Sequence, residues 1–139
     1  MKKLRRVGIT AGVAAAGLSL TALVTAPANA AVTGVSVASQ GTYSTNCSYT
    51  VTATGSEDTT ITITATPGDA TTPDTTLTVK PNASSKTASV NWTPKSVAKY
   101  TITAKQGDSD KSGKSATVDV TNKGFKLGPI CLALPTSLS

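Results

Sequence analysis

Apolar residues alternate with threonine or serine at every second position along much of this chain. In residues 47–54 and 59–66 nearly every other side chain is apolar, with hydroxyl side chains between. A period of two puts one row of side chains on each face of a β-strand, so that one face can be buried while the other meets water. The 139 residues include 26 threonines, and threonine favours strands over helices. The pattern predicts an all-β fold.

The alternation recurs in seven short segments separated by glycine, proline, asparagine and aspartate, which favour chain reversals. The predicted strands cover residues 33–38, 47–54, 59–66, 75–80, 86–93, 99–105 and 115–121. Short strands with turns at intervals of about a dozen residues predict a single-domain β-sandwich. A disordered Thr/Ser-rich linker would not place Ile, Val and Trp in regular alternation.

The first 30 residues have the pattern of a secretory signal peptide. Four basic residues among the first six precede an apolar stretch over residues 7–24, and Ala28-Asn29-Ala30 follows. This order of basic, apolar and small residues predicts a signal peptide over residues 1–30, with cleavage after Ala30 and secretion to the extracellular space. The apolar stretch is also long enough to span a bilayer, so an uncleaved anchor is the alternative.

The charge of the mature part argues against several kinds of partner. Residues 31–139 carry nine lysines, no arginine and seven acidic residues, and nine minus seven leaves a net charge of +2. The lysines are scattered, whereas nucleic-acid binders cluster Arg and Lys with aromatic residues between them. We therefore expect no nucleic-acid partner. We also expect no membrane contact once the signal peptide is removed, and a monomer.

Two neighbouring motifs resemble those of a known family. Residues 90–94 have the sequence Val-Asn-Trp-Thr-Pro, and residues 99–104 have the sequence Lys-Tyr-Thr-Ile-Thr-Ala. They are similar to the W-T-P and G-x-Y-x-[IV]-x-A elements of bacterial immunoglobulin-like domains, although Ala98 stands where glycine is usual. The resemblance implies an immunoglobulin-like β-sandwich of about seven antiparallel strands over residues 31–123, and it names no ligand.

Three residues of these motifs are expected in the structural core. Tyr100 precedes Ile102 by two positions, and antibody domains have a cysteine at the position of Ile102, so Tyr100 takes the place of the tyrosine corner. Its phenol is expected to hydrogen-bond the backbone of the preceding turn. Trp92 is expected to be the main core aromatic. A surface role for Trp92 is the alternative, because tryptophan also anchors interfaces.

The two cysteines, Cys47 and Cys131, are expected to form a disulfide bond. Two cysteines in an exported chain already favour a bridge. With strands running alternately up and down, the tail after the seventh strand leaves from the end of the sandwich at which strand 47–54 begins. We therefore expect the tail, residues 124–139, to be packed on the sandwich or linked to it by the disulfide. An eighth strand in the tail and unpaired or intermolecular thiols remain open.

No arrangement of residues in the sequence suggests catalysis, a metal or a cofactor. Histidine, the commonest general base and metal ligand, is absent. Both cysteines are assigned to the bridge, and no motif suggests a Ser–Lys or paired-aspartate site. We therefore expect a non-enzymatic module with no cofactor and no metal. Recognition or adhesion, at the cell surface or in the extracellular space, is the predicted function.

The partner is expected to be a protein or glycan surface that contacts the loops between strands. The candidate contact residues are Tyr43, Glu57, Asp58, Asp108 and Asp110. Tyr43 is the aromatic residue expected to be exposed. Asp108 and Asp110 also resemble part of a calcium loop, but the closing bidentate glutamate is missing, which favours a solvated loop. A small-molecule carrier of the chromoprotein type and a purely structural surface protein are the alternatives.

Overall fold

The computed structural model describes residues 31–39, 41–56, 59–107 and 113–134, and these residues form nine β-strands and no helix. The strands are β1 (Val32–Val37), β2 (Tyr43–Ser44), β3 (Tyr49–Gly55), β4 (Ile61–Pro67), β5 (Thr75–Val79), β6 (Thr87–Trp92), β7 (Ala98–Gln106), β8 (Lys114–Leu127) and β9 (Ile130–Leu134). The prediction of an all-β fold is confirmed.

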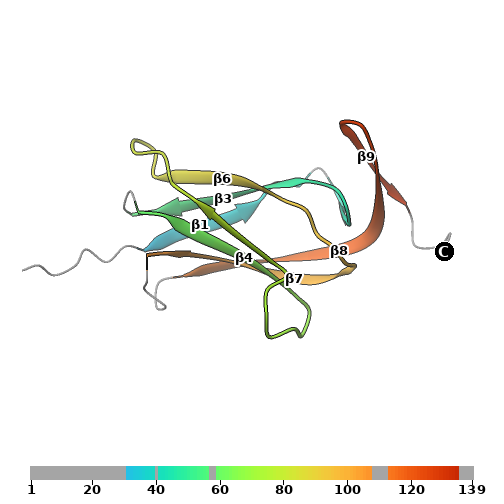
Figure 1. Ribbon diagram of the computed structural model, residues 1–139, viewed down its shortest axis with the longest axis horizontal. Helices are drawn as coiled ribbons and strands as arrows, with labels where there is room; N and C mark the ends of the chain where they lie inside the picture. The colour runs from blue at the N-terminus through green and yellow to red at the C-terminus, as the bar shows by residue number, and fades with distance from the viewer. Residues whose placement is uncertain (1–30, 40, 57–58, 108–112, 135–139) are drawn as a thin grey trace, which may run out of the picture.

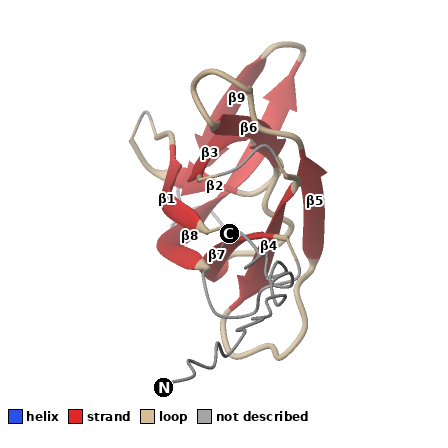
Figure 2. Ribbon diagram, turned by 90° about the vertical axis from the view of Figure 1, so that its left-hand side faces the viewer, coloured by secondary structure: helices blue, strands red, loops and turns tan. Residues whose placement is uncertain are grey.

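The strands form two sheets that lie one above the other, as expected for a β-sandwich (Figure 1). The smaller sheet has the order β1-β3-β6. The larger has the order β2-β8-β7-β4-β5, and β9 pairs with β8 outside this path. Figure 2 shows β5 at one edge of the larger sheet. All pairs are antiparallel except β2 with β8, which is parallel.

The seven predicted strands correspond to β1 and to β3 through β8, and most of their ends agree within two residues. The exception is the end of β8, which the sequence places at residue 121 and the structure places at Leu127. β8 runs continuously through residue 123, after which the sequence predicts the start of the tail. β2 and β9 are additional strands: β2 has only two residues, too few to show a periodicity, and β9 is a strand in the tail, which the sequence leaves open.

The core lies between the two sheets and is built from the alternating residues of β1, β3, β4, β6, β7 and β8. Trp92, Tyr100 and Ile102 are each at most 1% exposed. The rings of Trp92 and Tyr100 contact each other edge to face, with centroids 5.0 Å apart. Such pairs contribute about 0.5–1.5 kcal/mol beyond the area that they bury. The threonines between the core positions face outward.

The Tyr100 hydroxyl anchors one end of the sandwich. It accepts hydrogen bonds from the backbone N–H groups of Lys95 at 3.3 Å and Ser96 at 3.2 Å, in the turn between β6 and β7. It donates one to Oδ2 of Asp74 at 2.8 Å, in the loop between β4 and β5. The backbone contact was expected from the tyrosine-corner position. The contact with Asp74 joins a second loop to the same hydroxyl.

At the opposite end of the sandwich a buried polar side chain ties two strand ends together. Gln106 is fully buried; its Oε1 accepts from the backbone N–H of Ser56 at 3.0 Å, and its Nε2 donates to the carbonyl of Thr59 at 2.9 Å. Gly55 makes this approach possible, since a Cβ there would lie 2.5 Å from Oε1 of Gln106. The amide satisfies backbone groups that would be costly to leave unpaired.

Candidate functional site

A disulfide bond joins Cys47, just before β3, to Cys131 in β9, with Cα atoms 5.6 Å apart and a separation of 84 positions in sequence. The predicted pairing is confirmed. It arises as the strand directions require, because β8 ends at the same end of the sandwich at which β3 begins. A disulfide is compatible with an oxidising, extracellular environment.

β8 and β9 form a hairpin, the β8–β9 hairpin (residues 123–134), which extends past the end of the larger sheet (Figure 1). Gly128, at a φ of 60°, and Pro129 form its turn. Directly opposite residues pair as Lys123 with Leu134, Phe125 with Leu132, and Leu127 with Ile130. Because side chains alternate between the faces of a strand, these six lie on one face of the hairpin, here called the outer face.

The inner face carries Gly124, Lys126, Cys131 and Ala133, and a glycine makes its approach to the body of the protein possible. A Cβ on Gly124 would collide with the carbonyl oxygen of Thr45 and would lie 2.7 Å from Sγ of Cys47. The N–H of Gly124 donates to Oγ1 of Thr45 at 3.3 Å, and Nδ2 of Asn46 donates to the Gly124 carbonyl at 3.3 Å. These bonds and the disulfide hold the inner face against the segment before β3.

The outer face is apolar and exposed. Phe125, Leu127, Ile130, Leu132 and Leu134 have exposed fractions of 54%, 55%, 60%, 48% and 49%. These five are neighbours across or along the hairpin, so they form one continuous surface. Scattered exposed apolar residues are normal, but a contiguous apolar patch on a soluble protein indicates an interaction site.

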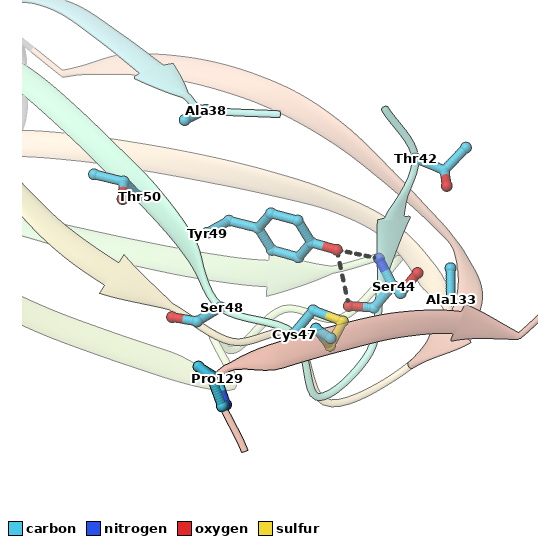
Figure 3. A pocket seen from close by; sticks show the side chains of 10 residues that line it. Ala38, Thr42, Ser44, Cys47, Ser48, Tyr49, Thr50, Pro129 and Ala133 are labelled. Atoms are coloured by element: carbon cyan, nitrogen blue, oxygen red, sulfur yellow. Dashed lines mark hydrogen bonds between the residues drawn. A yellow bond between two sulfur atoms is a disulfide. The ribbon is translucent and has the colours of Figure 1, made fainter. Parts of the chain in front are cut away.

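A pocket of about 450 Å³ lies between the hairpin and the segment that includes β2 and the start of β3 (Figure 3). Pro129, Cys131 and Ala133 line it from the hairpin, and the hydroxyl residues Thr42, Ser44, Ser48, Tyr49 and Thr50 line it from the body. The lining includes no charged side chain. Hydroxyl groups and one aromatic ring could bind a small neutral polar molecule.

The hydroxyl of Tyr49 shapes the wall of this pocket. It accepts a hydrogen bond from the backbone N–H of Ser44 at 2.6 Å and lies 3.4 Å from the carbonyl oxygen of the same residue (Figure 3). Oγ of Ser44 is buried and has no hydrogen-bond partner among the described residues. The Tyr49 phenol therefore fixes β2, while the serine hydroxyl beside it keeps unused hydrogen-bonding capacity.

The structure places Tyr43 differently from the expectation of an exposed loop aromatic. Tyr43 lies in β2 and is half-buried, its ring 4.9 Å from that of Tyr49, and its hydroxyl donates to the carbonyl of Val37 at 3.1 Å. The prediction missed this because β2 has only two residues, so no alternation marks it. Tyr43 therefore packs against Tyr49, which lines the pocket, and its role as a partner contact stays a prediction.

The other four predicted contact residues, Glu57, Asp58, Asp108 and Asp110, lie outside the described residues. The calcium alternative for the loop of residues 108–112 falls there too and stays a prediction. Within the described part of the chain, no group of three or more His, Cys, Asp or Glu side chains could hold a metal ion. No helix capable of crossing a membrane occurs among the described residues either.

Asp74 and the hairpin were not identified as important from the sequence. Asp74 is one of several loop aspartates, and only the fold brings it to Tyr100. The tail was expected to pack on the sandwich or to be linked to it by the disulfide, and nothing in the sequence revealed that its apolar side chains would face outward. No protein family, curated protein or solved structure matches this chain.

Proposed function

We propose that the mature protein is a secreted, non-catalytic recognition or adhesion module with an immunoglobulin-like fold, and that it contacts its partner through the β8–β9 hairpin. The observation that carries the proposal is the outer face, with five large apolar side chains each about half-exposed. Proteins bind one another through such surfaces, in which aromatic and aliphatic anchors supply most of the binding energy. The cell surface or the extracellular space is the proposed place of action.

The strand order supports the immunoglobulin-like part of the proposal. The smaller sheet contains β1, β3 and β6, which are the first, second and fifth of the seven predicted strands. The larger sheet contains β5, β4, β7 and β8, which are the fourth, third, sixth and seventh. One pairing differs: in antibody constant domains the fourth strand lies beside the fifth, whereas here the fourth predicted strand, β5, pairs with the third, β4. The buried Trp92 and the corner contacts of Tyr100 also agree with such a sandwich.

Two features support secretion. The first 30 residues have the composition and order of a signal peptide, with a basic start and the Ala28-Asn29-Ala30 box. The Cys47–Cys131 disulfide is of the kind that persists in oxidising compartments.

The chemistry of the side chains supports a non-catalytic role. The chain has no histidine, and both cysteines are joined in the disulfide, so neither a His-activated serine nor a cysteine nucleophile can form. Binding without turnover is therefore the activity proposed.

The test is capture from the producing cell's envelope and from host matrix, with the oxidised mature domain (residues 31–139) on the resin. The double variant Phe125→Ser/Leu132→Ser removes the centre of the outer face. Val97→Ser is the matched control, because Val97 is also apolar and 46% exposed but lies outside the hairpin. We expect capture by the parent and the control and its loss in the double variant.

Equal capture by all three proteins would contradict the proposal, as would turnover of a substrate that co-purifies with the recombinant domain. Equal melting temperatures of the three proteins establish that a loss of capture is not a loss of folding.

The pocket beside Tyr49 favours a small-molecule carrier as the second candidate. Its hydroxyl lining suits a small polar ligand better than an apolar chromophore. Native mass spectrometry of protein secreted into the medium would reveal a retained ligand as added mass. A mass equal to that of the oxidised chain would count against this candidate.

A further inference from the structure

The outer face of the β8–β9 hairpin cannot turn inward. β8 connects the hairpin to the sandwich through a continuous strand, and the disulfide from Cys131 connects its second strand to Cys47. The close approach at Gly124 fixes which face meets the body. The outer apolar side chains are thus held toward solvent by covalent and steric constraints on the opposite face.

The area of this face matches the largest apolar patch of a typical monomer and is small for a dimer interface. Five half-exposed side chains of this size present roughly 400–500 Å², within the ~300–600 Å² of such patches, which are often functional. Two copies packed face to face would bury roughly 1,000 Å² in total, below the ~1,200 Å² of specific stable interfaces. The area of the outer face therefore argues against a second copy of the chain as its partner.

The charge of the hairpin has one sign. Lys123 and Lys126 are its charged residues, both are exposed, and residues 123–134 contain no acidic side chain. Lys123 lies on the outer face, opposite Leu134. The long stem of Lys126 can bring its ammonium group past the edge of the strand. Two copies would bring like charges together, whereas an anionic surface would attract both lysines.

We propose that the outer face of the β8–β9 hairpin docks on an anionic lipid surface. Phe125, Leu127, Ile130, Leu132 and Leu134 would enter the boundary between headgroups and acyl chains, and the two lysines would meet the headgroups. Lipid binding of this kind grows with buried apolar area and with attraction to anionic lipids, and it needs no matched partner surface. The hairpin stands at one end of the molecule, where it can reach a flat surface (Figure 1).

This inference rests on the proposed recognition function, because it names the surface that is recognised, and it departs from the sequence-based expectation of no membrane contact. It predicts a peripheral contact that the folded domain makes after cleavage, distinct from anchoring by residues 7–24. An apolar contribution and an electrostatic contribution should be separable, since they depend on different side chains.

The experiment is co-sedimentation of the oxidised mature protein (residues 31–139) with vesicles of phosphatidylglycerol and phosphatidylcholine, and with vesicles of phosphatidylcholine alone. We expect binding to the anionic vesicles, weaker binding to the neutral ones and weakening by salt. Phe125→Ser/Leu132→Ser should lower the affinity about tenfold or more, and Val97→Ser should leave it unchanged. Lys123→Gln/Lys126→Gln should lower it on anionic vesicles only, with the exposed Lys80→Gln as the matched charge control.

Three results would overturn the inference: no sedimentation with anionic vesicles, equal affinity of the parent and the Phe125→Ser/Leu132→Ser variant, or a stable dimer in analytical ultracentrifugation that this variant abolishes. If vesicle binding fails while envelope capture still depends on Phe125 and Leu132, the lipid inference is wrong and the proposed recognition function stands. If both assays fail for the folded protein, both proposals are wrong.

Discussion

The phenol of Tyr100 donates a 2.8 Å hydrogen bond to Oδ2 of Asp74, which precedes it by 26 residues. Asp74 is itself oriented by the hydroxyl of Thr75, which donates to Oδ1 at 2.9 Å, and its carbonyl accepts from Nζ of Lys95 at 2.7 Å. The loop between β4 and β5 and the turn between β6 and β7 are therefore joined through one buried hydroxyl.

Tyr100→Phe should destabilise the protein by about 1–3 kcal/mol, because the backbone N–H groups of Lys95 and Ser96 and the carboxylate of Asp74 lose their shared partner. Urea unfolding of both proteins measures the difference. Asp74→Asn is the matched control: it keeps an acceptor for the phenol and should cost less than Asp74→Ala. If Tyr100→Phe unfolds at the same urea concentration as the parent, this network does not stabilise the fold.

Trp92→Ala should destabilise the protein more, by roughly 3–5 kcal/mol, since it opens a cavity between the two sheets. Thermal unfolding followed by circular dichroism checks this value. Trp92→Phe should cost clearly less, because Nε1 of Trp92 has no hydrogen-bond partner among the described residues and its loss leaves no acceptor unsatisfied. If both variants lower the free energy of unfolding by the same amount, the volume of the buried indole ring does not account for the stability.

Cys47→Ser/Cys131→Ser should lower the melting temperature and cost about 4–5 kcal/mol, the loop-entropy estimate for a span of 84 residues. The double variant is preferred, since it leaves no lone thiol to form intermolecular bonds. Non-reducing peptide mapping of the parent should recover the two cysteine peptides linked. Alkylation of both thiols in the native oxidised protein would contradict the pairing.

Gly124→Ala should destabilise the protein by roughly 1–3 kcal/mol, because the added methyl group meets the carbonyl of Thr45 and Sγ of Cys47. Gly34→Ala is the matched control: a Cβ at Gly34 has nothing within 4 Å, so the change should be neutral or slightly stabilising. Thermal unfolding compares the two. Equal effects would show that the inner face of the hairpin is not closely packed.

The mature protein should begin at Ala31, as the Ala28-Asn29-Ala30 box predicts. Intact-mass measurement of protein from the culture medium gives the answer directly. The mass of the full 139-residue chain in that medium would contradict cleavage.

The strands that bury one face could be predicted, because successive side chains of a strand point to opposite faces and burial of one face therefore appears in the sequence as alternation. Ile61, Ile63 and Ala65 alternate with threonine, and all three lie in the core. The disulfide could be predicted because strand directions alone bring Cys47 and Cys131 to one end of the sandwich.

The hairpin and the polar contacts could not be predicted in the same way. The apolar residues of Phe125 to Leu134 do alternate, and the sequence leaves an eighth strand in the tail open, but alternation does not show which face of a strand is exposed. The contacts of Asp74 and Gln106 join residues 26 to 50 positions apart, so they depend on the completed fold. Local sequence carries no sign of them.

The disulfide also determines how the protein would respond to mechanical tension between its two ends. Pulling on the chain beyond β9 loads Cys131, and the S–S bond passes the load directly to Cys47. The 84-residue span between the cysteines, a contour of roughly 280 Å when extended, therefore cannot lengthen. Among the strands of the described residues, only β1, β2 and the end of β9 lie outside this covalent loop. A surface-bound molecule under shear would yield by peeling these short strands, while most of the sandwich and most of the hairpin stay off the force-bearing path.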